Sequence, residues 1–171
     1  MNSVQELMAE CTEAHHQGDV AREATARGLL LVTWLQEACG ISENNARATL
    51  KIYVKLRDID KRDKVIERLT GILQGNGKTV HEDSVKDLAD CYMSRKKWSA
   101  KRLRGLYEGK GLYRCLLALR GLELGYGDPR HSLLSVFKQM TEAGHQRRQG
   151  SFVGITGQVQ QQVHIEWWRA Q

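Results

Sequence analysis

The chain has 171 residues, of which 41% are hydrophobic and 27% are charged, so its composition is that of a globular protein with one or two small domains. The formal net charge of +6 favours a polyanionic partner such as nucleic acid. The N-terminus lacks the pattern of a signal peptide, and the longest apolar run, residues 29–32, is too short to span a bilayer. We therefore expect a cytoplasmic protein that does not contact membranes.

The cysteines are widely separated in the sequence and include no C-x-x-C pair. This spacing argues against a zinc site or a disulfide framework and favours buried, reduced thiols. The four positions are Cys11, Cys39, Cys91 and Cys115.

The first half of the chain predicts four helices that are separated by turn signals. Residues 4–14 predict a short helix that ends before Gly18, and Asp19 then caps a helix that runs to about residue 38. Ser42 caps a third helix, and a fourth covers about residues 63–73. Apolar side chains recur at spacings of three and four residues in these segments, which indicates that their main role is core packing.

The second half predicts further helices after a glycine-rich loop at residues 75–77, which is the best candidate for a domain boundary. One helix is expected from Asp83 or Ser84 through Trp98, and a short one follows the Ser99 cap. Two more are expected over residues 112–124 and around residues 133–140, with a firm break between them at residues 125–129.

Residues 153–167 differ from the rest of the chain because apolar and polar side chains alternate there. This period of two is typical of a strand with one buried face. A lone strand is not stable in water, and the preceding sequence offers no sheet for it to join. We therefore expect this tail to pair with the same segment of other copies. The apolar positions that would form this oligomer contact are Val153, Ile155, Val159, Val163, Ile165 and Trp167.

Residues 32–50 fit a helix-turn-helix unit, in which Cys39 and Gly40 end the first helix and Ser42 begins the second. Asparagine and arginine side chains early in such a second helix suit base edges and phosphates in a major groove. The alternative is an ordinary helical hairpin with no role in DNA binding. The residues expected to contact DNA are Ser42, Asn44, Asn45, Arg47, Lys51 and Lys55.

A second basic tract begins at residue 95, and Trp98 and Tyr107 are interleaved with its cations. Such a tract either contacts phosphates without reading sequence, or is a solvated helix face whose aromatic side chains pack inside. Its candidate phosphate contacts are Arg95, Lys96, Lys97, Lys101, Arg102 and Arg104.

No catalytic or metal site is expected from the sequence. Residues 75–79 read GNGKT, but a phosphate-binding loop requires an earlier glycine and a preceding strand, so we interpret them as a turn between helices. None of the six histidines has a metal-ligand partner at helical spacing, and no nucleophile lies beside a base. We expect neither enzyme activity nor a bound metal or cofactor.

The order of these parts resembles the small terminase subunits of tailed bacteriophages. Residues 32–50 match the DNA-binding unit of that family, residues 112–140 match helices that pack between subunits, and residues 153–167 match its C-terminal tail. The resemblance implies a ring-shaped oligomer that recognises viral DNA and delivers it to a large terminase subunit carrying ATPase and nuclease activities. It also implies that the tails of successive subunits pair into an intersubunit β-barrel.

We therefore expect a mainly α protein with a helix-turn-helix DNA-binding domain over residues 1–74, a helical oligomerisation domain over residues 75–148 and a C-terminal β tail over residues 149–171. The expected function is recognition of double-stranded DNA during phage DNA packaging in the host cytoplasm. Two alternatives stay open: a dimeric helix-turn-helix transcription regulator of a phage or plasmid, and a phage protein that inhibits a host enzyme. Subunit number and salt-dependent DNA affinity separate these functions.

Overall fold

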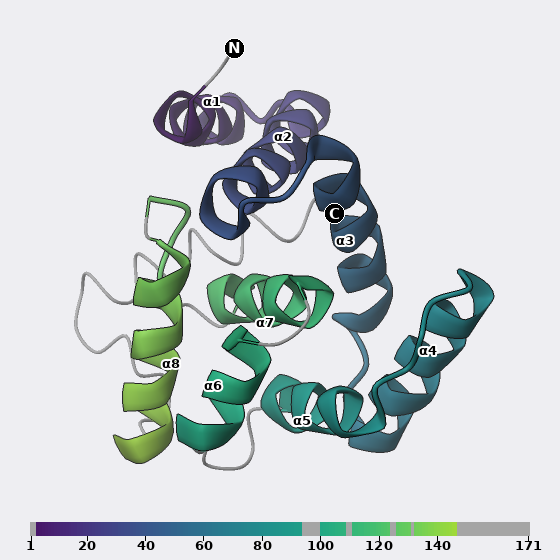
Figure 1. Ribbon diagram of the computed structural model, residues 1–171. Coiled ribbons are helices and arrows are strands. Elements are labelled where there is room, and N and C mark those ends of the chain that lie inside the picture. Colours follow the sequence, from purple (N-terminus) through teal and green to yellow (C-terminus); the bar gives the residue numbers. More distant parts are fainter. Residues whose placement is uncertain (1–2, 94–99, 109–110, 124–125, 131, 147–171) are drawn as a thin grey trace.

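A computed structural model describes residues 3–93, 100–108, 111–123, 126–130 and 132–146 of the chain (Figure 1). Every regular element within these ranges is an α-helix, which confirms the expected mainly α fold. The expected β tail and the residues after Met93, through Ser99, lie outside the described ranges. The helices are α1 (Val4–His16), α2 (Val20–Cys39), α3 (Glu43–Leu56), α4 (Arg62–Gly75), α5 (Glu82–Met93), α6 (Ala100–Glu108), α7 (Gly111–Glu123) and α8 (Leu133–Gln146).

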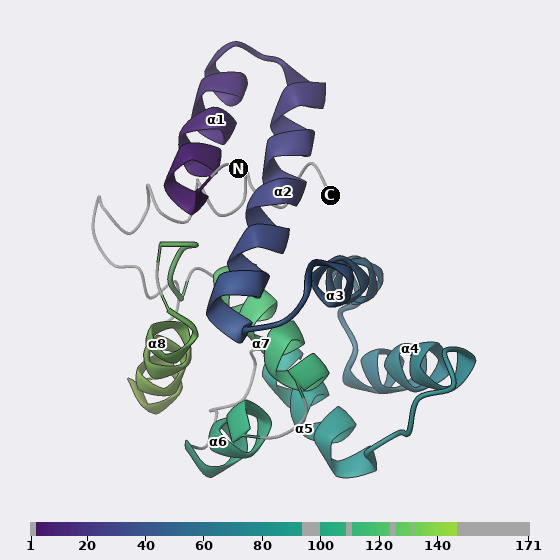
Figure 2. The same cartoon turned by 45° about the horizontal axis from the view of Figure 1, so that its top comes forward.

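Helices α1 and α2 form a hairpin, of which α1 and the N-terminal half of α2 extend away from the other helices (Figure 2). Its turn is built as the sequence predicts, because Gly18 adopts a φ of 69° and the Asp19 side chain accepts a hydrogen bond from the Arg22 backbone N–H at 3.1 Å. The hairpin has its own hydrophobic cluster, which is distinct from the main core. Its buried members are Val4, Leu7, Cys11, Ala26 and Leu30.

Charged side chains also connect the two helices of this hairpin. The Arg22 Nη2 donates to Glu10 Oε2 at 2.9 Å, and the Arg22 Nε bonds to the other oxygen of the same carboxylate. Deeper in the hairpin, the buried Arg27 guanidinium pairs with Glu23, whose Oε1 also lies 3.2 Å from His15 Nδ1. Two charged groups can be buried together here because each provides the counter-charge of the other.

Helix α7 is the centre of the main core (Figure 1). It packs against α2, α3, α5, α6 and α8, and an unbroken run of its side chains, residues 115–119, is buried. A helix that is apolar on nearly every side is stable only when neighbours surround it, and this explains its position. The C-terminal half of α2 belongs to this core, from Leu31 to Cys39.

The glycine-rich loop after α4 is a turn, in which Gly77 has a φ of 69° and Lys78 N donates to Leu73 O at 2.9 Å. Helix α5 then returns along α4, and Arg62 forms an ion pair with Asp90 across the two helices. The main hydrophobic cluster contains residues on both sides of this loop, from Leu31 to Met140. The helices before and after the expected boundary at residue 75 therefore share one core.

No helix in the described part of the chain has both the length and the apolar composition that a bilayer-spanning segment needs.

Candidate nucleic-acid interface

The turn between α2 and α3 has the conformation that the sequence predicts. Gly40 adopts a φ of 65°, a left-handed conformation that favours glycine, and its N–H donates to Gln36 O at 3.1 Å. Ser42 is the N-cap of α3, and its hydroxyl accepts a hydrogen bond from the Asn45 N–H at 3.2 Å. The chain therefore leaves α2 and begins α3 within three residues.

Buried side chains hold α2 and α3 together at this turn. Leu35, Cys39 and Ala46 are buried in the main cluster, and the partly buried Ile41 packs against it. Thr49 is also buried, and its hydroxyl donates to the Asn45 carbonyl at 2.8 Å, so this polar group is satisfied within the helix. The inner side of α3 thus packs against the core.

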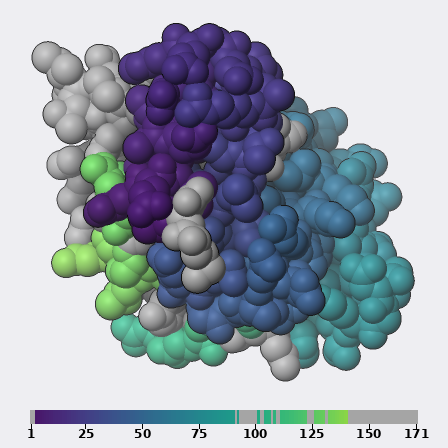
Figure 3. Space-filling view, turned by 90° about the horizontal axis from the view of Figure 1, so that it is seen from above, coloured from purple at the N-terminus to yellow at the C-terminus, as the bar shows by residue number. Residues whose placement is uncertain are grey.

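The outer side of α3 carries an exposed polar and basic stripe. Asn44, Arg47, Lys51 and Lys55 follow one another at spacings of three, four and four residues, which places them on one face of a helix with 3.6 residues per turn. All four are exposed, and the segment around them is open at the surface beside the α1–α2 hairpin (Figure 3). We call these four residues the α3 stripe.

An ion pair lies at the start of the α3 stripe. Arg47 Nη2 lies 3.1 Å from Glu43 Oε1, and the two side chains are 50% and 58% exposed. Pairs this exposed contribute only about 0–1 kcal/mol, so the Arg47 guanidinium can exchange this carboxylate for another anion at little cost.

Two of the six residues expected to contact DNA do not belong to the α3 stripe. The Ser42 hydroxyl serves as the helix cap, and Asn45 lies on the side of α3 that is turned toward α7. There Asn45 lines a cavity of about 190 Å³, together with Thr49, Lys78 and Cys115. The sequence groups Asn45 with Arg47 because they are close in the chain, but two residues of helix separate their directions by about 200°.

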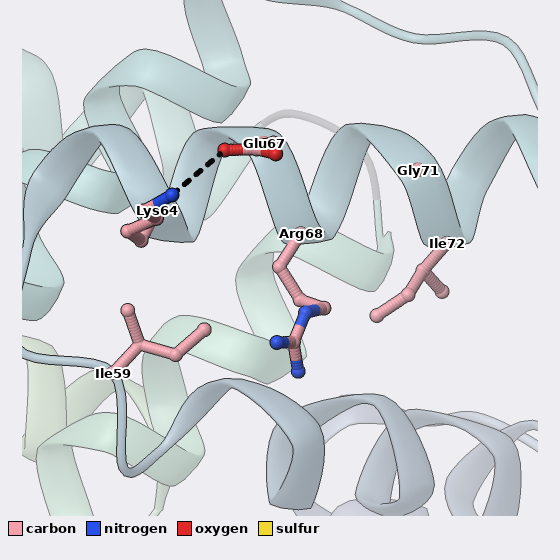
Figure 4. A pocket seen from close by; sticks show the side chains of 6 residues that line it. All are labelled: Ile59, Lys64, Glu67, Arg68, Gly71 and Ile72. Atoms are coloured by element: carbon pink, nitrogen blue, oxygen red, sulfur yellow. Dashed lines mark ion pairs between the residues drawn. The ribbon is translucent and has the colours of Figure 1, made fainter.

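A cation on α4 that the sequence did not predict lies beside the end of the α3 stripe. Arg68 Nη1 donates to the backbone carbonyl of Lys55 at 3.4 Å, where the negative end of the α3 dipole favours a cation. Figure 4 shows the Arg68 side chain reaching from α4 across a cavity of about 540 Å³ that Ile59 borders. The spacing of Lys64 and Arg68 could have indicated a basic face on this helix, but only the tertiary structure brings it next to Lys55.

The second basic tract is only partly described. Arg95, Lys96 and Lys97, and the side chain of Arg102, lie outside the described part of the structure. Lys101 and Arg104 are exposed on α6, which packs against α5, α7 and α8. Figures 1 and 2 show α7 between α6 and α3, so these two cations belong to a different surface from the α3 stripe.

The residues expected to form the oligomer contact also lie outside the described ranges, so this role stays a prediction for Val153, Ile155, Val159, Val163, Ile165 and Trp167. Comparisons of the chain with protein-family models, with curated proteins and with solved structures find no match. A functional interpretation therefore depends on the geometry of α3 and on the order of parts in the sequence.

Proposed function

We propose that this protein binds double-stranded DNA through the α3 stripe. The observation that carries the proposal is the division of α3 into a buried side that packs on the core and an exposed side that presents Asn44, Arg47, Lys51 and Lys55. The major groove of B-DNA is about 12 Å wide and accepts an α-helix. A helix held rigidly by its inner face and polar on its outer face suits that groove.

The order of the four side chains suggests their separate roles. The first residues of a recognition helix reach base edges in helix-turn-helix proteins, which assigns base contacts to Asn44 and Arg47. Lys51 and Lys55 lie one and two turns further along, where they would neutralise phosphates. Arg68 lies next to the Lys55 carbonyl and would extend the phosphate contacts onto α4.

We further propose that the protein acts as an oligomeric recognition subunit in phage DNA packaging, passing DNA to a large terminase subunit. This narrower role is supported by the order of the DNA-binding unit, the helical middle and the alternating tail in the sequence. Several copies of α3 on one assembly would contact one DNA molecule together, which raises the overall affinity without any new contact.

The DNA-binding proposal is tested by fluorescence anisotropy with the full-length protein and a labelled DNA duplex over a range of salt concentrations. We expect log Kd to rise linearly with log salt concentration. The slope should fall by about 2 in the double variant Lys51→Ala/Lys55→Ala, because each phosphate contact contributes about 0.9 to the slope. The matched control is Lys86→Ala/Lys138→Ala, which removes two exposed lysines from α5 and α8.

An equal change in slope for both double variants would contradict the proposal, because it would show that net charge alone determines binding. The absence of salt-dependent binding in the wild type would also contradict it and would favour a protein that inhibits a host enzyme. Native mass spectrometry of the same sample separates a ring from a two-fold dimer, the assembly expected of a transcription regulator.

A further inference from the structure

The described part of the chain exposes three large hydrophobic side chains, and one of them lines a groove on the α1–α2 hairpin. Val20 is 71% exposed, Leu29 38% and Leu134 63%. Leu29 lines the groove, whereas Val20 lies at the start of α2 outside its lining and Leu134 lies in the first turn of α8. Single apolar side chains on a surface are common, but an apolar groove on the same molecule provides a place where an exposed leucine can be buried.

The groove follows the contact between α1 and α2 and has a volume of about 490 Å³. Cavities of about 300–1,000 Å³ hold drug-sized molecules, so this groove has room for a leucine side chain. Its acidic lining residues are Glu10 and Asp19. Its apolar lining residues are Leu7, Ala21, Ala26 and Leu29.

The hairpin around the groove is acidic. Residues 1–40 contain six acidic side chains and only two arginines, and each arginine is paired within the hairpin, Arg22 with Glu10 and Arg27 with Glu23. The net charge of this segment is therefore −4, which leaves +10 for residues 41–171 of a chain whose total is +6. A surface of this sign repels DNA and attracts a basic protein, and the rest of a second copy is such a protein.

The surroundings of Leu134 have the matching charge. Lys138 is exposed one turn after Leu134 on α8, and Arg130, whose side chain is 56% exposed, precedes this helix. Figures 1 and 2 show α8 as the outermost helix on one side of the described fold. Leu134 is therefore an accessible apolar side chain with cations near it, whereas the groove is an apolar surface with acids near it.

We propose that the hairpin groove is a docking site for a second copy of this chain, and that Leu134 is the side chain that enters it. Leu134 is not among the residues that line the groove of its own copy. Because the groove and the leucine belong to different elements, each copy can offer its leucine to one neighbour and accept the leucine of another. Contacts of this head-to-tail kind build a ring when the rotation between copies closes.

The apolar contact holds the copies together, and the charges around it bring them to each other. Charges at the rim of an interface act mainly on the rate of association and on its salt dependence. Leu134 therefore matters more for affinity than Lys138. This docking site goes beyond the proposed DNA binding and the predicted pairing of the tails, because it uses neither α3 nor residues 149–171, and the failure of either would leave it unaffected.

The test joins the two surfaces in a mixture of two co-expressed full-length variants. One copy carries Leu29→Cys and the other carries Leu134→Cys, and both positions are exposed, so the fold should be kept. After mild oxidation, peptide mass spectrometry should find a disulfide between the two introduced thiols, which must join different copies because each variant has only one of them. The matched control uses Val20→Cys in place of Leu29→Cys. It should give at least ~10-fold less of the link, because only the groove holds the two thiols together.

Self-association of the protein without introduced thiols is the second measurement. In sedimentation velocity over a dilution series, Leu134→Ser should raise the Kd of self-association about 10-fold or more, because burial of a leucine side chain contributes at least this factor. Val20→Ser is the matched control and should leave the Kd unchanged, and circular dichroism checks that each variant is folded. Rising salt should raise the Kd of the wild type.

Three results would overturn the proposal. The first is a wild type that stays monomeric at every concentration, which would show that the groove serves a different basic protein. The second is an oligomer in which the introduced thiols at residues 29 and 134 form no more of the link than the Val20→Cys control. The third is an equal change of Kd in Leu134→Ser and Val20→Ser, which would show that loss of any exposed apolar side chain has the same effect.

Discussion

The guanidinium of Arg120 donates two hydrogen bonds to the backbone carbonyl of Tyr92, at 2.6 Å from Nη2 and 3.1 Å from Nε, and its Cζ lies 5.0 Å from the centroid of the Tyr92 ring. Arg120 belongs to α7, and Tyr92 is the penultimate residue of α5. Hydrogen bonds from a charged guanidinium to a carbonyl oxygen are stronger than those between neutral groups. This contact joins α5 to the central helix.

Replacing Arg120 with lysine should remove the paired geometry while it keeps the positive charge. We expect the free energy of unfolding to fall by about 1–2 kcal/mol, because a lysine can form neither the planar two-point contact nor the same stacking on Tyr92. Urea denaturation followed by circular dichroism measures this change. The control is Arg104→Lys on the exposed side of α6, and equal losses in both variants would contradict the structural role of Arg120.

Helices α7 and α8 approach closely at Gly121. A Cβ atom at this position would lie 2.7 Å from Val136 Cγ1 and 2.9 Å from Met140 Sδ, and both neighbours are fully buried. Gly121→Ala should therefore lower the free energy of unfolding by about 1–3 kcal/mol. Gly71→Ala on α4 is the matched control, because a Cβ there meets no atom within 4 Å and should be neutral or stabilising by up to about 1 kcal/mol. Calorimetric midpoints that fall equally in both variants would disprove the close contact.

Local signals in the sequence predict the helix ends where a side chain or a glycine defines them. Asp19 and Ser42 cap α2 and α3 as expected, and Gly40 adopts the left-handed conformation that its position in the turn suggested. The start of α4 carries no such signal, because Lys61 at its N-cap makes no side-chain capping hydrogen bond. An Asp or Ser cap can be predicted from the sequence, whereas a lysine that forms no capping hydrogen bond cannot.

Contacts between distant residues could not be predicted in the same way. The pairing of Arg120 with Tyr92 and of Arg68 with Lys55 depends on how the helices pack, and helical periodicity carries no information about the partner of each face. The position of Asn45 was available from helix geometry alone. Its proximity to Arg47 in the chain obscured the fact that it lies on another side of α3.

The α1–α2 hairpin should become less stable in acid through Glu10. The hydrogen bonds from Arg22 lower the pKa of Glu10 below its ordinary value of 4.5, so the folded state favours the ionised carboxylate. The stabilisation of the fold by the ionised Glu10 carboxylate is fully present above pH 4.5 and is lost as the pH falls through the lowered pKa of the folded state.

Urea titrations at several pH values test this prediction. Glu10→Gln should have a lower free energy of unfolding than the wild type at neutral pH and the same free energy of unfolding in strong acid. The control is Glu67→Gln, which removes a more exposed ion pair with Lys64. If the free energy of unfolding of Glu10→Gln differed from that of the wild type by the same amount at every pH, the prediction would be contradicted.

The tail is predicted to join subunits through its alternating apolar side chains. Deletion of residues 151–171 should therefore lower the number of subunits seen by native mass spectrometry, while circular dichroism still reports a helical protein. An unchanged subunit number after this deletion would show that the assembly, if one forms, depends on other segments of the chain.

The most direct measurement of the proposed DNA interface is the acetylation of individual lysines with and without a saturating DNA duplex, quantified by mass spectrometry of the full-length protein. Lys51 and Lys55 belong to the α3 stripe, whereas Lys86 and Lys138 are also exposed but lie on α5 and α8. We predict that DNA strongly reduces the acetylation of Lys51 and Lys55 and leaves that of Lys86 and Lys138 nearly unchanged. Equal acetylation of Lys51 and Lys55 with and without bound DNA would contradict DNA binding by α3.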